Sequence, residues 1–133
     1  MPIILSGLHL LMAALFVLSA AVQYNDPDPS LWITIYTGAA LLSLQAASRR
    51  LVFPVAWAWC LGAIAVAIWL VFTQIGALSM DLDNEVFREL GGLAITAFWM
   101  GVVAMQDSAQ RRHQAALEAA ERTGRTIASR PPK

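Results

Sequence analysis

Long apolar stretches separated by short polar segments dominate the sequence. Four windows contain no Asp, Glu, Lys or Arg: residues 1–25, 29–48, 51–80 and 90–106. Each window is close to the ~20 residues, at ~1.5 Å rise per residue, that a helix needs to cross ~30 Å of hydrocarbon. The pattern predicts four membrane-spanning helices, near residues 3–22, 31–48, 52–72 and 88–106.

Buried helices of a water-soluble protein are the alternative interpretation of these windows. Soluble helices average ~11–12 residues and carry a polar stripe, which the four windows lack. The composition also favours a membrane protein, because 58% of the residues are apolar and 14% are charged, against ~45–50% and ~25% in soluble domains. We therefore predict an all-α fold, an integral membrane bundle of four transmembrane helices over residues 1–106.

The first apolar run has a feature of a signal peptide, namely the small residues Ser19, Ala20 and Ala21 near its end. No Lys or Arg precedes the run, and the run is longer than the 7–15 residues of a signal-peptide core. We expect this helix to be retained as the first span.

The charged residues are segregated between the two sides of the predicted bundle. Eight of the nine basic residues follow the second or the fourth span: Arg49, Arg50, Arg111, Arg112, Arg122, Arg125, Arg130 and Lys133. The positive-inside rule places that side in the cytoplasm. With three acids it has a net charge of +5, whereas six acids and Arg88 give the other side −5. We predict a multi-pass inner-membrane protein with both termini in the cytoplasm.

The segment after the fourth span has a different composition. Residues 106–123 are rich in Ala, Glu and Arg, and the chain then runs to a Pro pair. We predict that residues 107–133 form a cytoplasmic polar tail that is helical and then frayed. Its arginines are interpreted as signals of topology and of attraction to anionic lipid rather than as a nucleic-acid site.

Several classes of chemistry find no support in the sequence. Cys60 is the only cysteine, so an intramolecular disulfide and a zinc site built from cysteines are excluded. There is no nucleophile–base–acid set, no phosphate-binding loop and no cofactor motif. We predict a protein that is not an enzyme and that binds no cofactor and no nucleic acid.

Aromatic and small residues agree with the predicted boundaries of the spans. Tyr24, Trp32 and Tyr36 fall near the outer end of the first hairpin, where amphipathic rings serve as membrane anchors. Small residues permit close contact between helices, among them Gly38, Gly62, Ala63, Ala67, Gly91 and Gly92.

Two polar motifs lie on the predicted outer side of the membrane. The first loop reads Gln-Tyr-Asn-Asp-Pro-Asp-Pro over residues 23–29 and is followed by Trp32 and Tyr36. The fourth span opens with Glu-Val-Phe-Arg-Glu-Leu-Gly-Gly-Leu over residues 85–93. Together these motifs resemble the transmembrane protein 220 family, small four-span membrane proteins of bacteria and animals. The family has a Gln-x-Asn-Asp-Pro-Asp stretch before a Trp and a Tyr, and an Arg-Glu-Leu-x-Gly-Leu stretch at the start of a later span.

The resemblance runs from the first to the fourth span and leaves the polar tail outside it. Animal members of the family continue beyond the point where this chain ends, so a role of a longer C-terminus is not carried over. The family brings no established activity. The resemblance implies a shared site or a shared constraint on the fold, not a reaction.

The first motif has a structural interpretation. Pro27 and Pro29 force Asp26 and Asp28 out of the helical region. Asp28 suits the N-cap of the second helix, with Pro29 at its first position, and Asn25 or Asp26 can close an Asx turn. These features describe a tight hairpin between two spans.

The second motif has both a structural and an energetic interpretation. Asp83 or Asn84 can cap the helix, and acids in its first turn suit the positive end of the helix dipole. Glu89 borders the apolar run, and a carboxylate drawn into hydrocarbon costs roughly 2.5–3.5 kcal/mol. Glu89 therefore needs a partner, either Arg88 or a donor of the first loop. We expect Glu89 and Arg88 to bond with the first motif across the mouth of the bundle.

Two functional hypotheses use the residues of both motifs. In the first they line an outward-facing pocket for a small polar ligand or a cation, because hard cations prefer carboxylate and carbonyl oxygens. In the second the same face docks another membrane or periplasmic protein. The candidate residues are Gln23, Asn25, Asp26, Asp28, Trp32, Tyr36, Arg88 and Glu89. The sequence does not identify a metal, since it contains no EF-hand spacing.

A transporter or ion-handling protein is the alternative function. It requires ionisable groups at depth, and within the spans the sequence offers only His9. An antiparallel hairpin that pairs Val22 with Leu31 places His9 opposite Leu44 or Gln45. We predict an intramembrane hydrogen bond between His9 and Gln45, worth ~0.6 kcal/mol by the membrane-protein average, and prefer it to a proton relay.

Overall fold

The structure is a computed structural model that describes residues 3–48, 53–74 and 85–128. These residues form four long α-helices and one short 3-10 turn. The elements are α1 (Ile3–Val22), η1 (Gln23–Asn25), α2 (Pro29–Ala47), α3 (Phe53–Gln74) and α4 (Glu85–Ala128). All four helices are long and apolar enough to cross a membrane. The predicted all-α, four-span architecture is confirmed.

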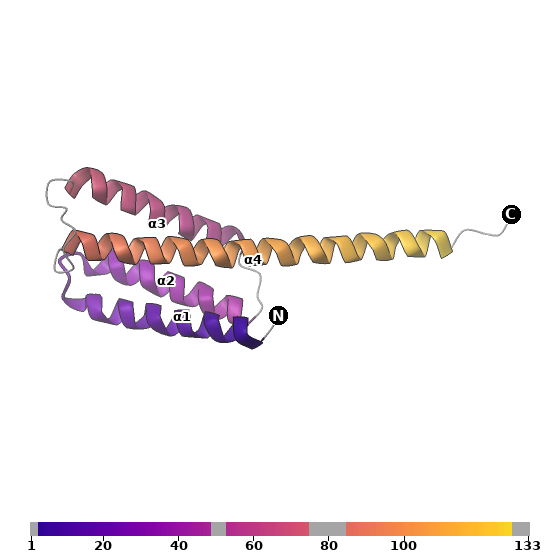
Figure 1. Ribbon diagram of the computed structural model, residues 1–133, viewed down its shortest axis with the longest axis horizontal. Coiled ribbons are helices and arrows are strands. Elements are labelled where there is room, and N and C mark those ends of the chain that lie inside the picture. The colour runs from indigo at the N-terminus through magenta and orange to yellow at the C-terminus, as the bar shows by residue number, and fades with distance from the viewer. Residues whose placement is uncertain (1–2, 49–52, 75–84, 129–133) are drawn as a thin grey trace.

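The four helices form two antiparallel hairpins, α1 with α2 and α3 with α4 (Figure 1). Helix α2 contacts both helices of the second hairpin and so holds the bundle together. One end of the bundle, called here the mouth end, contains the last residues of α1 and α3 and the first residues of α2 and α4. The start of α1 and the free part of α4 lie at the opposite end.

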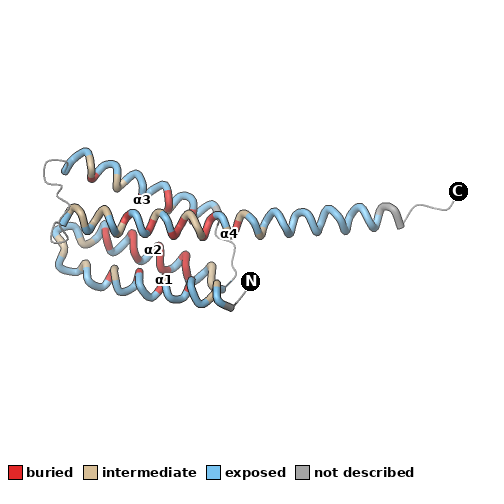
Figure 2. The backbone as a smooth tube through the Cα atoms, in the orientation of Figure 1, coloured by how far each residue is buried: buried red, intermediate tan, exposed pale blue. Residues whose placement is uncertain are grey.

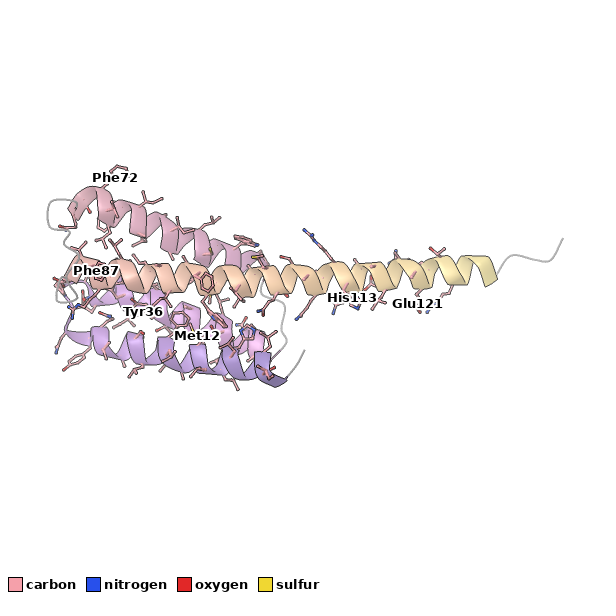
Figure 3. The ribbon with its side chains drawn as sticks, in the orientation of Figure 1. Met12, Tyr36, Phe72, Phe87, His113 and Glu121 are labelled. Atoms are coloured by element: carbon pink, nitrogen blue, oxygen red, sulfur yellow. The ribbon has the colours of Figure 1, made fainter. Side chains whose placement is uncertain are left out.

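The outer surface of the bundle is apolar, whereas the buried residues form a narrow core between the helices (Figure 2). Phe72 and Phe98 are 78% and 73% exposed, and Phe72 projects from α3 away from the other helices (Figure 3). Soluble proteins rarely expose large contiguous apolar surfaces. Such a surface on helices of spanning length is that of a bundle in contact with lipid.

Two glycines allow aromatic rings of other helices to approach the backbone. A Cβ atom on Gly38 of α2 would overlap the indole of Trp59 in α3, and one on Gly92 of α4 would overlap the hydroxyl of Tyr36 in α2. Among the described residues nothing lies within 4 Å of a Cβ built on Gly62 or Gly91. Close approach therefore explains two of the four glycines that the sequence singles out.

Side-chain hydrogen bonds join the two hairpins inside the bundle. The indole Nε1 of Trp99 in α4 donates to Ser43 Oγ in α2 at 2.9 Å, and this hydroxyl donates to the carbonyl of Ala39 at 2.8 Å. The indole Nε1 of Trp59 in α3 donates to the carbonyl of Ile35 in α2 at 3.0 Å. A hydrogen bond between membrane helices contributes about 0.6 kcal/mol on average, so these bonds add modestly to the packing of the two hairpins.

His9 is fully buried, but its partner is not the predicted one. Its Nε2 lies 3.0 Å from Oε1 of Gln106 in α4, and its ring makes an edge contact with Trp99 at 5.2 Å between centroids. Gln45 is exposed, so the predicted pair of His9 and Gln45 is wrong. The hairpin register gives the depth of a residue but not its direction. At 100° per residue, Gln45 lies about 200° around α2 from the buried Ser43.

The aromatic residues of α2 are also placed differently from the expectation. Trp32 and Tyr36 are 3% and 6% exposed and belong to the core, so their interpretation as membrane anchors at the level of the headgroups is wrong. They follow α2 with the spacing i, i+4 and therefore share the face that packs against the other helices. Tyr24 remains exposed at the mouth end.

Helix α4 continues without a break beyond the other helices, as Figure 1 shows. The 22 residues after Gln106 add about 33 Å at 1.5 Å per residue, and His113 and Glu121 lie on this exposed extension (Figure 3). The described helix includes Gly124 and ends at Ala128. The predicted fraying of the tail concerns residues beyond it, which lie outside the described ranges.

Candidate functional site

The loop between α1 and α2 is a compact polar turn. Helix α1 passes into the 3-10 turn η1, which is closed by the N–H of Asp26 donating to the carbonyl of Gln23 at 3.1 Å. Asp26 is extended, with φ −68° and ψ 151°, as expected for a residue before proline. Its Oδ1 accepts the N–H of Asp28 at 3.1 Å. The predicted Asx turn is therefore present, and Asp26 forms it.

Asp28 occupies the N-cap position of α2 with Pro29 in the first turn, as the sequence indicates. Its side chain makes no capping hydrogen bond. The backbone instead closes the turn, because the carbonyl of Asp28 accepts the N–H of Leu31 at 3.2 Å. The carboxylate of Asp28 thus remains at the surface of the mouth end.

The first turn of α4 brings two carboxylates to the same end of the bundle. Glu85 and Glu89 are four residues apart and share one face of the helix. Arg88 lies between them in sequence and is exposed. The residues expected to cap this helix, Asp83 and Asn84, lie outside the described residues.

The loop and the start of α4 enclose a cavity of about 460 Å³, called here the acidic cavity. Three helices and the loop contribute to it, and every element supplies at least one polar side chain except α1. Its lining residues are Val22, Gln23, Asn25, Asp26, Pro27, Trp32, Tyr36, Glu85, Arg88 and Glu89. Asp28 lines a neighbouring cavity of about 370 Å³, and the two cavities share Asp26, Pro27, Trp32, Glu85 and Glu89.

Three carboxylates converge in the acidic cavity. One oxygen each from Asp26, Glu85 and Glu89 lies within 4.8 Å of the others. Asp26 and Glu89 are half-buried, and Glu85 is exposed. Like charges at this separation repel by roughly 1–3 kcal/mol per pair, depending on the local dielectric. The cluster therefore favours any cation that reaches it.

The two motifs meet across this cavity and not through a direct bond. Among the described residues, no hydrogen bond or ion pair joins Arg88 or Glu89 to the first loop. The expectation of such a bond is therefore not met in the part of the chain that the structure describes. Seven of the eight predicted site residues nevertheless line the acidic cavity, and the eighth, Asp28, lines its neighbour.

Stacked aromatic rings form the inner wall of the acidic cavity. Trp32 and Tyr36 have centroids 6.3 Å apart at an interplanar angle of 26°. Phe16 of α1, which does not itself line the cavity, also stacks against Tyr36, with centroids 6.4 Å apart at an interplanar angle of 21°. The wall separates the polar mouth from the apolar core and leaves the Tyr36 hydroxyl against Gly92.

Glu85 is the residue that the sequence-based site omits. The spacing of Glu85 and Glu89 indicated one helix face, but its contribution to the cavity depends on how α4 is rotated toward the loop. Carboxylate oxygens are the ligands that Ca²⁺ and Mg²⁺ prefer, and an ammonium group makes charge-assisted hydrogen bonds to the same oxygens. Arg88 adds the capacity to hold an anionic group.

Fold and site together define a class: a four-span α-helical membrane protein with an acidic cavity at one end of its bundle. The profile of the family described as "Transmembrane family 220, helix" matches residues 15–105, so the chain belongs to this family. The matched range begins in α1 and ends in α4, and includes both polar motifs.

A similar protein is Transmembrane protein 220 of Xenopus laevis, which is 31% identical over 121 residues. The alignment covers 84% of this chain and 61% of the frog protein, so the chain spans about three-fifths of the length of that relative. No solved structure gives a significant match to the chain. The family is one of transmembrane proteins of uncharacterised function.

Proposed function

We propose that this protein is a small, non-enzymatic binding or accessory protein of the cell inner membrane, whose acidic cavity binds a small positively charged ligand. The convergence of three carboxylates within 4.8 Å carries this proposal. The cavity volume of about 460 Å³ suits a compact organic cation or a hydrated metal ion. Residues 23–29 and 85–93, the motifs behind the family resemblance, supply most of its lining.

The acidic cavity faces the extracytoplasmic side in this proposal. The support is the positive-inside rule, because eight of the nine basic residues follow the second or the fourth helix in sequence, whereas the mouth is formed by the loop after the first helix and the start of the fourth. Both termini are then cytoplasmic, and the extension of α4 projects into the cytoplasm. The cavity would draw its ligand from the periplasm or the outer surface of the membrane.

A cation titration tests the binding function. The purified full-length protein in detergent is titrated with Ca²⁺, Mg²⁺ and choline in parallel while thermal unfolding is followed. At least one of these cations should raise the Tm of the wild type, and Asp26→Asn and Glu89→Gln should each remove the shift. Glu118→Gln is the matched control, because it removes the same charge from the exposed extension of α4. Equal responses of Glu118→Gln and Glu89→Gln to every cation contradict the proposal.

A labelling experiment tests the orientation independently of the ligand. Single cysteines replace Asp28 at the mouth and Ala119 on the α4 extension, in a chain whose native Cys60 is buried. A membrane-impermeant maleimide should label the first variant in intact cells and the second only after lysis. Labelling of Ala119→Cys in intact cells would place the mouth in the cytoplasm and overturn the orientation.

A transporter that uses the same mouth is the second candidate, and a polar seam along α4 favours it. On the side of α4 that faces the first hairpin, Glu89 is followed at helical spacing by Thr96, Trp99 and Gln106, which together span the bundle. Trp99 donates a hydrogen bond to Ser43, and Gln106 is hydrogen-bonded to His9; both partners belong to the first hairpin. The Nδ1 atom of His9 is buried and has no hydrogen-bond partner among the described residues.

Flux through proteoliposomes separates the two candidates. A transporter moves the cation that stabilises the protein across the bilayer, and Thr96→Val should then slow flux while the Tm response at the mouth persists. A binding protein gives the Tm response with no flux above protein-free liposomes, which is the result we expect.

A further inference from the structure

A second groove lies at the opposite end of the bundle, where α4 leaves the other helices. It has a volume of about 700 Å³ and lies between the start of α3 and the middle of α4. Its lining residues are Trp57, Met105, Ser108, Ala109, Arg111 and Arg112. The groove belongs to neither polar motif and is separate from the acidic cavity.

The lining changes from apolar to basic along α4. Met105, Ser108, Ala109 and Arg112 follow each other at i, i+3, i+4 and i+7, so they form one stripe on the surface of the helix. Trp57 of α3 adds an apolar wall at the level of Met105. Ser108 is occupied within its helix, because its hydroxyl donates to the carbonyl of Ala104 at 2.7 Å. The groove therefore has an apolar floor and a basic rim.

The two arginines of the rim have different surroundings. The Nε of Arg111 lies 3.7 Å from Oδ2 of the buried Asp107, one turn earlier in α4, which directs its side chain along the helix. Arg112 is exposed, and no ion pair or hydrogen bond joins it to another residue within ranges 3–48, 53–74 and 85–128. The N–H groups of its guanidinium can therefore donate hydrogen bonds to an external anion.

The heights of these residues match the layers of a bilayer. Met105 belongs to the last apolar residues of the fourth span, and Trp is typical of the level of the lipid headgroups. Arg112 is seven residues beyond Met105, about 10 Å along the axis. Arginine side chains extend their charged group toward the interface, so in a bilayer whose hydrocarbon ends near Met105 the guanidinium of Arg112 would be within reach of the phosphates.

We propose that this groove binds an anionic phospholipid. Its phosphate is held by the guanidinium of Arg112 with support from Arg111, and its glycerol and upper acyl chain lie against Trp57 and Met105. Guanidinium groups match phosphate in a bidentate geometry, and basic pockets between transmembrane helices are typical sites for anionic headgroups. The apolar floor indicates a lipid rather than free phosphate, because inorganic phosphate has no apolar part that could pack against it.

Competition between lipids tests the proposal on the full-length protein. The protein is purified in mild detergent with equimolar phosphatidylglycerol and phosphatidylcholine, and retained lipid is measured by native mass spectrometry. The wild type should retain phosphatidylglycerol in preference. Arg112→Gln should lower that preference roughly fivefold, the equivalent of the ~1 kcal/mol that one arginine contributes near an anionic surface. Arg112→Lys keeps the charge but loses the bidentate geometry of the guanidinium. Its preference for phosphatidylglycerol should lie between those of the wild type and Arg112→Gln.

Arg122→Gln is the matched control, since it removes one positive charge from the same helix ten residues farther from the bundle. Its lipid preference should equal that of the wild type. An equal loss in Arg112→Gln and Arg122→Gln would mean a general electrostatic effect and would overturn the site. Equal retention of the two lipids by the wild type would overturn it as well, as would release of phosphatidylglycerol by excess inorganic phosphate.

Discussion

The hydroxyl of Tyr36 in α2 occupies the space into which a side chain on Gly92 of α4 would extend. This contact joins the two hairpins directly beneath the acidic cavity, because Tyr36 also lines the cavity. The contact also links the two polar motifs by packing. Tyr36 follows the first motif in sequence, and it packs against Gly92 of the second motif. The position of the Glu85–Glu89 face relative to Asp26 therefore depends on this contact.

Gly92→Ala is expected to destabilise the bundle by about 1–3 kcal/mol, the usual cost of overpacking a filled interior. Thermal unfolding in detergent measures the change. Gly91→Ala is the control, since among the described residues nothing lies near its Cβ position. Tyr36→Phe should recover much of the loss in the double variant. If Gly91→Ala and Gly92→Ala lower the Tm equally, the contact does not have the proposed role.

Gln106→Leu is expected to cost about 0.6 kcal/mol and at most about 1.7, the range of single hydrogen bonds between membrane helices. The substitution removes the only hydrogen-bond partner that the described residues give to His9. Gln45→Leu provides the matched control, because Gln45 is exposed on the surface of α2. A larger loss in Gln45→Leu than in Gln106→Leu would contradict the observed pairing.

Gly38→Ala is expected to destabilise the contact between α2 and α3, because its new Cβ would overlap the Trp59 indole. Displacing that ring also breaks the bond from Trp59 Nε1 to the Ile35 carbonyl. The expected cost is again about 1–3 kcal/mol. Gly62→Ala, in open space on α3, should leave the Tm unchanged or raise it slightly, since alanine favours the helix. The same order of Tm values is expected in any mild detergent.

Glu89→Gln is expected to raise the Tm at low ionic strength when no cation is added. It relieves the repulsion with Asp26 and Glu85, which is roughly 1–3 kcal/mol per pair before screening. The gain should shrink as NaCl is raised, because salt screens partly exposed charges. Asp26→Asn should act in the same direction, and the double variant should gain less than the sum of the two. Additive effects that are independent of salt would mean that the carboxylates do not interact.

Local sequence features were sufficient for the architecture of this protein. The absence of charge over spanning lengths set the number of helices, because no charged group is tolerated in hydrocarbon without compensation. Pro27 and Pro29 determined the position of the first loop, because each proline keeps the residue before it out of the helical conformation. The two polar motifs could be assigned to one end of the bundle from alternation of the spans alone.

Pairings between residues of different helices required the tertiary structure. His9 was matched with Gln45 by depth and lies against Gln106, because the rotation of a helix about its axis follows from packing with all its neighbours. Trp32 and Tyr36 suited the membrane interface by type and lie in the core instead. Glu85 joined the site through the same rotation of α4.

The sequence by itself determined four lipid-facing helices, the segregation of acids and bases, and the turn at residues 23–29, because each follows from the cost of placing a single residue in a given environment. Only the tertiary structure decided which polar groups meet. The reason is geometric: a uniformly apolar helix surface gives no sequence signal for its rotation, and interlocking contacts such as Tyr36 against Gly92 fix it.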